Sequence, residues 1–366
     1  MLNYALAGAK DDAALRARMA ADWLEGNITV SFRREPSFFY GSMVQGAQAQ
    51  VIKCVDSESG QLVGLGSRLL NEAYVNGSRQ RIGYLADLRA HPDYRGGIGL
   101  GRAYQFLLQL HQDDPVPLYY SMILDENRMA LQLLTRARRG LPLYRDMGRF
   151  LTPVINLDLP RRAIPLAGIH FRRASKADLQ TIFDFIARQA PQKQFAPVIG
   201  AQDMHGTRLR GLKAEDFYLA LRDGHIVGTI AAWDQTGFRQ TCVERYSAGL
   251  RMLRPFYNTL SRFTAFKPLP DPGCTLPYFY LAFVNIEDND AQLFRGLLRY
   301  LYRDRRSGPW SYFVAGLHES DPLSRVLSEY RSIEAAGRLF AVHYAEDQQA
   351  YEQLDGRIPY VEIAMI

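Results

Sequence analysis

Cysteine and long apolar runs are what this sequence has least of. Only three of its 366 residues are cysteine, and Cys54, Cys242 and Cys274 lie far apart. Their odd number and wide spacing argue against a disulfide framework and against a CxxC metal site, so we expect a cytoplasmic setting and no bound metal. No apolar stretch reaches the roughly 18 residues of a membrane-spanning helix. The N-terminal residues lack the features of a signal peptide, and we expect no membrane partner.

Positive charge is only slightly in excess over negative charge. The chain has 44 Lys and Arg against 38 Asp and Glu, for a formal net charge of +6. No basic run is interleaved with a nucleic-acid-binding motif, which argues against a nucleic-acid partner, while the excess suits an anionic cofactor or substrate. A hydrophobic content of 47% with 22% charged residues is typical of a globular protein, and the length favours two domains.

Residues 81–110 form the most distinctive stretch. A polar turn at 76–78 and Pro92 bound residues 81–90 and predict a strand there. The spacing of Leu100, Ala103, Leu107 and Leu110 predicts a following helix. The loop between them is rich in glycine, which lets a backbone approach a ligand, and a helix start offers free N–H groups and a positive dipole end. The stretch therefore predicts an anion site, and phosphate suits it best.

Three kinds of phosphate loop compete for this stretch. A Walker A loop needs Lys and a hydroxyl residue after its last glycine, and Arg102 and Ala103 stand there instead. A dinucleotide fingerprint needs a third glycine at the position of Arg102, where the helix must pack closely on the strand. Both of these alternatives fit poorly, and the third kind of loop is the one that this segment resembles.

Segment 88–102 strongly resembles the pyrophosphate loop of the CoA-dependent acyltransferases of the GNAT superfamily. It has a strand ending, the Pro-acid-aromatic turn His-Pro-Asp-Tyr, an arginine and the paired glycines Gly99 and Gly101. It departs from the family pattern at one point, because Arg95 lies one residue further upstream than the pattern has it. The extra residue is a glycine, and we interpret it as a slightly longer loop of unchanged purpose.

The resemblance implies an α/β (α+β) fold of two tandem GNAT-like domains, each a mixed, mostly antiparallel twisted sheet flanked by helices. It covers about residues 1–157, where Asn127 also matches the N-x-x-A start of the family's next helix. We expect a CoA-binding domain at residues 1–158, a linker at 159–168 and a second GNAT-like domain at 169–366. The predicted order of elements in the second half resembles that of the first.

The second domain is expected to be a degenerate partner that does not bind CoA in the usual way. Its equivalent junction, residues 283–290, has no glycine and carries three acids that would repel a pyrophosphate. An aromatic cluster in this half is interpreted as its core, with the lining of a site for an apolar acceptor or long acyl chain as the alternative. The cluster consists of Phe256, Tyr257, Phe263, Phe266, Tyr278, Phe279 and Tyr280.

The resemblance also implies roles for residues around the loop. The backbone of Leu88 and Ala90 would pair with pantetheine, and the Leu88 N–H would donate to the developing oxyanion. Asn127 would hydrogen-bond the cofactor tail. The pyrophosphate would be held by backbone N–H groups and arginine charge. The residues expected there are Arg95, Gly96, Gly97, Ile98, Gly99, Leu100, Gly101 and Arg102.

Proton transfer needs a base and an acid near the same strand. The candidate base is Asp87, immediately before the expected bulge, and the alternative is a structural pair with Arg89 or Arg81. Leu134 stands where the family often has a tyrosine acid. The candidates to replace that acid, which are otherwise aromatic residues of the sheet and core, are Tyr144, Tyr119 and Tyr120.

The resemblance thus implies an N-acetyltransferase that transfers an acyl group from acetyl-CoA, or another acyl-CoA, to a small-molecule or peptide amine by direct attack in a ternary complex. The second half would select the acceptor or form a homodimer. One alternative is a non-catalytic acyl-CoA-binding or regulatory protein, favoured by Leu134. The other is a tandem aminoacyl-tRNA-dependent transferase, favoured by the twin domains and basic charge. The glycine loop and the lack of a long helical arm argue against the latter.

Overall fold

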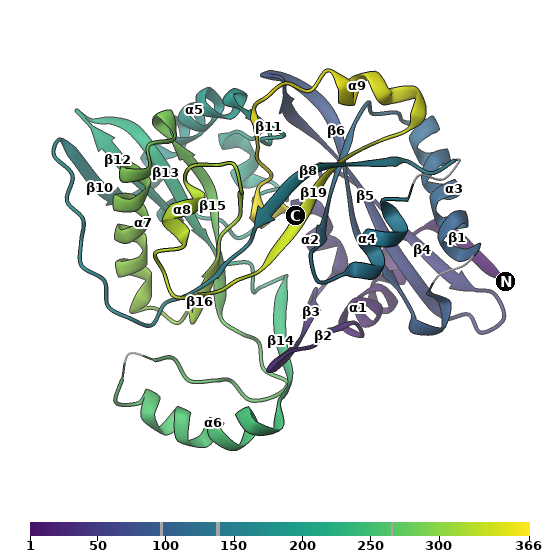
Figure 1. Ribbon diagram of the computed structural model, residues 1–366, viewed down its shortest axis with the longest axis horizontal. Coiled ribbons are helices and arrows are strands. Elements are labelled where there is room, and N and C mark those ends of the chain that lie inside the picture. Colours follow the sequence, from purple (N-terminus) through teal and green to yellow (C-terminus); the bar gives the residue numbers. More distant parts are fainter. Residues whose placement is uncertain (96–97, 137–139, 265) are drawn as a thin grey trace.

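Two twisted sheets lie side by side in the computed structural model, which describes residues 1–95, 98–136, 140–264 and 266–366 (Figure 1). The first sheet consists, in spatial order, of β1 (Leu2–Leu6), β4 (Gln48–Asp56), β5 (Leu62–Val75), β6 (Ser78–Ala90), β7 (Tyr119–Leu124), β19 (Ala336–His343), β8 (Leu143–Leu151) and β17 (Leu317–His318). The second consists of β10 (Ile169–Arg173), β12 (Phe217–Arg222), β13 (His225–Trp233), β15 (Tyr278–Ile286), β16 (Tyr312–Val314), β9 (Val154–Asn156) and β18 (Ser332–Ile333). Most neighbouring strands are antiparallel, which confirms the predicted fold class.

Helices cover both faces of the first sheet. Residues Asn76 and Gly77, both at positive φ, turn β5 back into β6 and so form the long hairpin at its centre. Because side chains alternate along β5, Leu65 faces α1 (Asp12–Ala20) and α2 (Phe38–Gln45). Leu70 faces the opposite side, where α3 (Ile98–Asp113) and α4 (Arg128–Leu134) pack.

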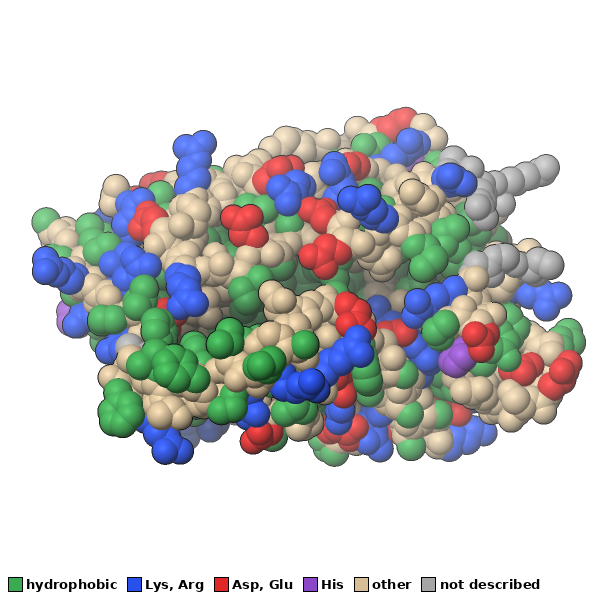
Figure 2. Space-filling view, turned by 60° about the horizontal axis from the view of Figure 1, so that its bottom comes forward, with side chains coloured by type: hydrophobic (Ala, Val, Ile, Leu, Met, Phe, Trp, Pro, Cys, Tyr) green, Lys and Arg blue, Asp and Glu red, His purple; other side chains and the backbone are tan. Residues whose placement is uncertain are grey.

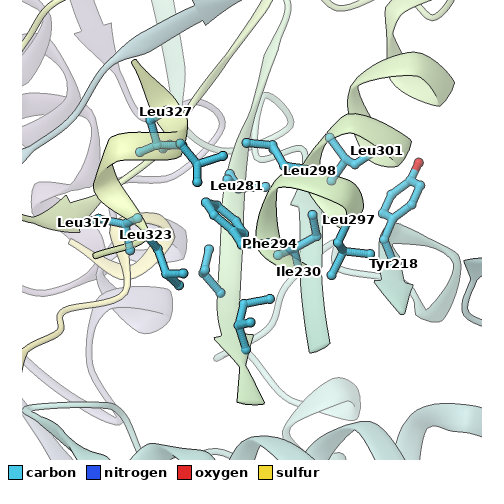
Figure 3. Close-up of a cluster of buried hydrophobic side chains, with 14 of the residues drawn as sticks. Tyr218, Ile230, Leu281, Phe294, Leu297, Leu298, Leu301, Leu317, Leu323 and Leu327 are labelled. Carbon is cyan, nitrogen blue, oxygen red and sulfur yellow. The ribbon is translucent and has the colours of Figure 1, made fainter. Parts of the chain in front are cut away.

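The second sheet has its own apolar core on each face. On one face, α7 (Ala291–Arg306) and α8 (Ser324–Leu327) pack against the strands (Figure 3). The side chains involved include Tyr218, Ile230, Leu281, Phe294, Leu297, Leu298, Leu301, Leu317, Leu323 and Leu327. On the other face, α5 (Leu179–Gln189) packs on Phe217 and Trp233.

The two sheets exchange strands. Strand β9 pairs with β16 and β18 in the second sheet, although it precedes the predicted linker. Strand β19 comes from the second half of the chain and lies between β7 and β8 of the first sheet. Each sheet is therefore completed by a segment from the other side of residues 159–168, and the division of the chain at that linker stays a prediction.

A small third sheet carries a helix away from the body. Strand β14 (Gln240–Tyr246) pairs with β3 (Ile28–Arg33), which pairs with β2 (Trp23–Leu24). The helix α6 (Ala248–Ser261) follows β14 and stands apart from both large sheets, at the bottom of Figure 1. Within the described parts of the chain, no helix is long and apolar enough to cross a membrane.

The predicted aromatic core of the second half is only partly correct. Tyr278 and Phe279 are buried in β15, as expected for core residues. Phe256 and Phe263, however, lie on and just after α6 and are 72% and 83% exposed. Spacing along a helix indicates an apolar face, but it does not indicate whether protein covers that face.

Candidate active site

A β-bulge in β6 lies at the centre of the candidate site. Ser67 of β5 faces Ala86 of β6, but Leu65, two residues earlier, faces Arg89, three residues later. The extra residue in β6 falls at Asp87, whose φ is +57°, a conformation that few residues other than glycine adopt. The bulge therefore includes Asp87 itself, whereas the resemblance implied a bulge immediately after it, and Leu88 directly after it is exposed.

Beside the bulge, β6 separates from its parallel neighbour β7. Their ladder pairing covers Gly83 with Tyr119 and Tyr84 with Tyr120. Further along, the Ser121 hydroxyl donates to the Leu85 carbonyl at 3.0 Å, and the ladder does not continue toward Ala90 within the described residues. We call this place, where the backbone of β6 is no longer paired with β7, the notch, because an extended ligand could pair with β6 there.

The glycine-rich loop leads into the first turn of α3. This helix begins at Ile98, so the turn offers backbone N–H groups that have no partner within the helix. The Tyr4 hydroxyl donates to the Gly99 carbonyl at 2.7 Å and fixes the turn on β1. A Cβ atom at Gly101 would meet no atom within 4 Å, so this glycine borders open space. Gly96, Gly97 and the Ile98 side chain lie outside the described residues.

The Asp87 side chain is held by two donors on the face opposite α3. Arg34 Nη2 donates to Oδ1 at 2.7 Å and Ser67 Oγ donates to Oδ2 at 3.2 Å. Both members of the ion pair are almost fully buried. Burial lowers the pKa of Arg34, and the neighbouring Asp87 carboxylate opposes that change. The second guanidinium nitrogen, Nη1, donates to Gln45 Oε1 at 2.9 Å, so a continuous network leads from the bulge to α2.

No protein-family model and no curated protein sequence matches the chain. Solved structures do match it. A GCN5-related N-acetyltransferase from Sphaerobacter thermophilus has a TM-score of 0.53 at 15% identity, covering 100% of this chain and 98% of that one. The N-myristoyltransferase of Saccharomyces cerevisiae with bound myristoyl-CoA has a TM-score of 0.61 at 10% identity, covering 94% and 83%. A GCN5-related N-acetyltransferase from Anabaena variabilis has a TM-score of 0.52 at 13% identity, covering 93% and 72%.

The chain has a GNAT-like fold. The predicted resemblance is thereby confirmed at the level of the fold, including its tandem arrangement. Identities of 10% and 15% do not transfer residue roles, so the roles of individual side chains depend on the geometry of this GNAT-like chain itself.

The arginines predicted for the GNAT-like loop have different surroundings. Arg95 forms an ion pair with Asp22 at 3.0 Å, and its Nε donates to the Ala90 carbonyl at 3.0 Å. Asp22 lies at the end of α1 and also pairs with Arg18 and Arg89. Arg102, in the first turn of α3, is exposed. Arg95 is thus fixed beside the strand end, whereas Arg102 extends into solvent.

The structural pair considered for Asp87 does form, but with a different partner. Arg89 pairs with Asp22 and Arg81 pairs with Asp114, so neither reaches Asp87. Arg34 takes that place, from the segment between β3 and α2. Sequence spacing gave no sign of this contact because the two residues lie 53 positions apart and meet only through the fold.

The predicted acid and the predicted cofactor amide do not converge on Asp87. The Tyr144 hydroxyl hydrogen-bonds the Tyr104 hydroxyl at 2.8 Å, and burial raises its pKa to about 12. Its strand, β8, is separated from β6 by β7 and β19, which places it about 14 Å away at normal strand spacing. The Asn127 side chain accepts from Ala130 N–H at 3.1 Å and caps α4.

Tyr119 and Tyr120, the other candidate acids, lie at the base of the notch. The Tyr119 hydroxyl accepts from Arg68 at 2.9 Å in the interior, and burial raises its pKa to about 12. Tyr120 stacks on Tyr84 with ring centroids 4.7 Å apart, and burial raises the pKa of both. Both hydroxyls therefore stay protonated near neutral pH, and that of Tyr119 is bound to Arg68 in the interior.

A small cavity adjoins the Asp87 network where the two sheets meet. Gln45, the partner of Arg34, forms part of its wall, and Tyr120 and Phe195 supply an aromatic side. The remaining lining residues are Asn71, Glu72, Ala73, Pro197, Arg208, Glu362 and Met365. Through Gln45 and Arg34 the wall of the cavity is connected to the Asp87 carboxylate.

The second sheet has a similar bulge, in β15, but there a side chain of the protein binds the backbone of the bulge. Thr229 and Ala231 of β13 face Asn285 and Ala282 of β15, which leaves one extra residue at Phe283, whose φ is +53°. The Phe283 N–H donates to Glu362 Oε2 at 2.8 Å in the interior. The chain's own carboxylate therefore binds the backbone group that corresponds to the bulge of β6. Sequence reasoning missed Glu362, which lies 79 residues away from Phe283.

The N-terminus of the helix that follows the second bulge is also occupied by a side chain of the protein. Asp290 caps α7, accepting from Gln292 N–H at 2.7 Å and from Leu293 N–H at 3.2 Å. The corresponding first turn of α3 is preceded by glycines instead of a carboxylate. These contacts agree with the expectation that the second GNAT-like half does not hold a pyrophosphate in the usual way.

Proposed function

We propose that this GNAT-like protein is an acyl-CoA-dependent N-acyltransferase that uses acetyl-CoA and an amine acceptor. The observation that carries the proposal is the combination of a bulged β6, its separation from β7 and the glycine-bordered first turn of α3. The yeast N-myristoyltransferase structure of similar fold contains bound myristoyl-CoA, which supports an acyl-CoA as the donor.

In this proposal the notch orients the thioester. The acyl-pantetheine arm lies along β6 and pairs with the backbone of Leu88 and Ala90. The pyrophosphate lies at the first turn of α3, near Gly99 and Gly101, with Arg102 in reach of its charge. The Leu88 N–H is directed at the thioester oxygen, so it can stabilise the negative charge that forms there during attack.

The transfer itself needs one proton removed and one thiolate released. The acceptor nitrogen attacks the thioester carbon, the C–S bond breaks and CoA leaves as its thiolate. Asp87 receives the proton of the attacking amine, directly or through a water molecule. Arg34 and Ser67 hold its carboxylate in a fixed orientation. We leave Tyr144 out of this step because of its distance from β6.

The loop is tested by binding of acetyl-CoA to Gly101→Glu, measured by titration calorimetry. Gly101 borders open space, so a side chain fits there, and the added carboxylate should repel the pyrophosphate and weaken binding at least tenfold. The matched control is Gly101→Gln, which adds the same bulk without charge and should bind much more tightly than Gly101→Glu. Unchanged binding in Gly101→Glu would show that the pyrophosphate lies elsewhere.

A non-catalytic acyl-CoA-binding protein is the second candidate. It is favoured by Asp87, whose two carboxylate oxygens both already accept hydrogen bonds. Release of free CoA thiol, followed over a panel of small amines, amino acids and peptides, separates the two. Tight acetyl-CoA binding without acceptor-dependent thiol release would favour the second candidate and reject the first.

A further inference from the structure

The helix α6 is attached to the protein by its polar side. Asn258 Nδ2 donates to the Leu269 carbonyl at 2.9 Å, and the Leu269 N–H donates to Asn258 Oδ1 at 2.8 Å. Arg254 Nε also donates to the Leu269 carbonyl, at 3.1 Å. The segment after the helix thus folds back along it and satisfies its polar side chains.

The apolar side of the same helix faces outward. At 100° per residue, its exposed large apolar side chains fall within an arc of about 100°. They are Met252, Leu253, Phe256 and Leu260, followed just beyond the helix by Phe263. Met252 is 81% exposed, and no residue of the helix is buried. Figure 2 shows apolar side chains gathered over this part of the molecule, with basic ones beside them.

All charges on this helical segment have the same sign. Between residues 248 and 263 the charged side chains are Arg251, Arg254 and Arg262, and there is no acid. Arg254 is neutralised by Asp271, whereas Arg251 and Arg262 are exposed. The adjoining small sheet exposes Trp23 as well. An occupant of this surface must therefore accept both apolar side chains and cationic groups.

A second copy of the chain meets only the first requirement. Two copies packed through α6 would cover the apolar arcs but would leave Arg251 and Arg262, on the other side of each helix, without an anionic partner. An anionic bilayer meets both requirements, because its acyl chains accept Phe and Met while its phosphates attract arginine. The position of α6 away from both large sheets leaves a flat surface room to approach (Figure 1).

We propose that α6 lies in the interface of an anionic phospholipid bilayer, with Phe256 and Phe263 among the lipid chains and Arg251 and Arg262 at the phosphates. This differs from the expectation of no membrane partner, which depended on the absence of a membrane-spanning run. A helix lying in the interface does not need such a run. The proposal is independent of acyl transfer, because it concerns a surface and not the bulge of β6.

Vesicle flotation with the full-length protein tests the proposal. We expect binding to vesicles that contain phosphatidylglycerol, weaker binding to pure phosphatidylcholine, and loss of binding as salt is raised. Phe256→Ser with Phe263→Ser should reduce binding at least tenfold, because less apolar area enters the lipid. The control, Ile333→Ser, removes one apolar side chain on β18 that is 63% exposed, and it should change nothing.

The contribution of the arginines to vesicle binding is tested with two double variants that change the net charge equally. Arg251→Glu with Arg262→Glu should also lower binding at least tenfold. Lys176→Glu with Arg325→Glu makes the same change in net charge at exposed positions elsewhere and should have a much smaller effect. Equal loss in both pairs would mean that the net charge of the protein, and not α6, attracts the vesicles.

Two other results would overturn the proposal. One is the absence of wild-type binding to anionic vesicles at low salt. The other is a stable dimer, seen by light scattering, that Phe256→Ser converts to a monomer, because a second copy would then cover this face. Far-ultraviolet circular dichroism and the midpoint of thermal unfolding verify that each variant is folded, and the mutated side chains are exposed, so folding should be unaffected.

Discussion

Asp87 combines a strained backbone conformation with a buried, fully hydrogen-bonded carboxylate. Strain of this kind persists only where surrounding contacts enforce it. Here Arg34 and Ser67 supply those contacts, and both reach the carboxylate from outside β6. The residue therefore shapes the bulge whether or not it also accepts a proton, and the two roles have to be separated by experiment.

We expect Asp87→Asn to lower the turnover number about a hundredfold or more, since the amide cannot accept the amine proton. Its acetyl-CoA affinity should change little, because the contacts proposed for the cofactor are made by the backbone. Tyr144→Phe, by contrast, should leave turnover nearly unchanged. Steady-state kinetics and calorimetry measure the two quantities. A Tyr144→Phe enzyme as impaired as Asp87→Asn would return the acid role to that tyrosine.

Removing the charge of Asp87 also leaves Arg34 buried without an anion, and this destabilises the fold. Thermal unfolding of Asp87→Asn and of Ser67→Ala provides the necessary comparison. Ser67→Ala removes one donor to the carboxylate but keeps its charge. If Ser67→Ala retains turnover while Asp87→Asn does not, the loss comes from the missing base and not from loosened packing.

Glu362 is the second buried carboxyl at a bulge, and its titration affects stability. Burial raises its pKa from 4.5 to about 7 in the folded protein. Between these two values the folded state keeps a proton that the unfolded state loses. The contribution of Glu362 to the free energy of unfolding is therefore fully present below pH 4.5 and is lost as pH rises through about 7.

Glu362→Gln should remove this pH dependence, because the amide does not titrate. Relative to the wild type, the variant should gain about 3 kcal/mol in the free energy of unfolding between pH 4.5 and 7. Urea unfolding at a series of pH values measures the difference. Parallel curves for the two proteins across that range would mean that Glu362 is already ionised in the fold.

At the scale of elements, the two bulged strands differ in whether side chains of the protein already bind the backbone beside the bulge. Strands β6 and β15 carry the same irregularity and diverge from their parallel neighbours in the same way. In the second sheet a carboxylate fills the bulge and another caps the next helix. In the second sheet, side chains of the chain itself therefore already occupy the N–H of the bulge residue and the first turn of the next helix.

Local signals in the sequence were sufficient to predict the strand and the helix on either side of the glycine-rich loop. The Asn76-Gly77 turn, the strand at residues 81–90 and the helix around residues 100–110 were predicted in place because their determinants are a few residues apart. The contacts of Arg34 and Glu362 were not predicted, since each joins segments that are distant in the chain. The exposed face of α6 was misassigned because periodicity is the same for a covered and an uncovered face.

At the scale of the whole molecule, the exchanged strands make the two sheets depend on each other. Strand β19 pairs with β7 on one side and β8 on the other, so the first sheet is continuous only with a segment from the second half. Strand β9 has the corresponding role in the second sheet. We therefore expect the two sheets to lose structure together.

Gly337→Ala tests this dependence. A Cβ atom there would lie 2.8 Å from the Ile123 carbonyl oxygen of β7, so the substitution should destabilise the protein by about 1–3 kcal/mol. Gly356→Ala, where a Cβ meets no atom within 4 Å, is the control. Trp233 lies in the second sheet, and its fluorescence should shift to lower denaturant together with circular dichroism. Two separate transitions, with only one shifted, would contradict a single unit.

The late position of β19 also has a consequence for the protein during its synthesis. On the ribosome, β6 and the loop of α3 emerge long before residues 336–343 do. Until then β7 and β8 have unpaired edges facing each other, which invite pairing with other chains. A nascent chain of this protein would need protection at that gap until residues 336–343 have emerged.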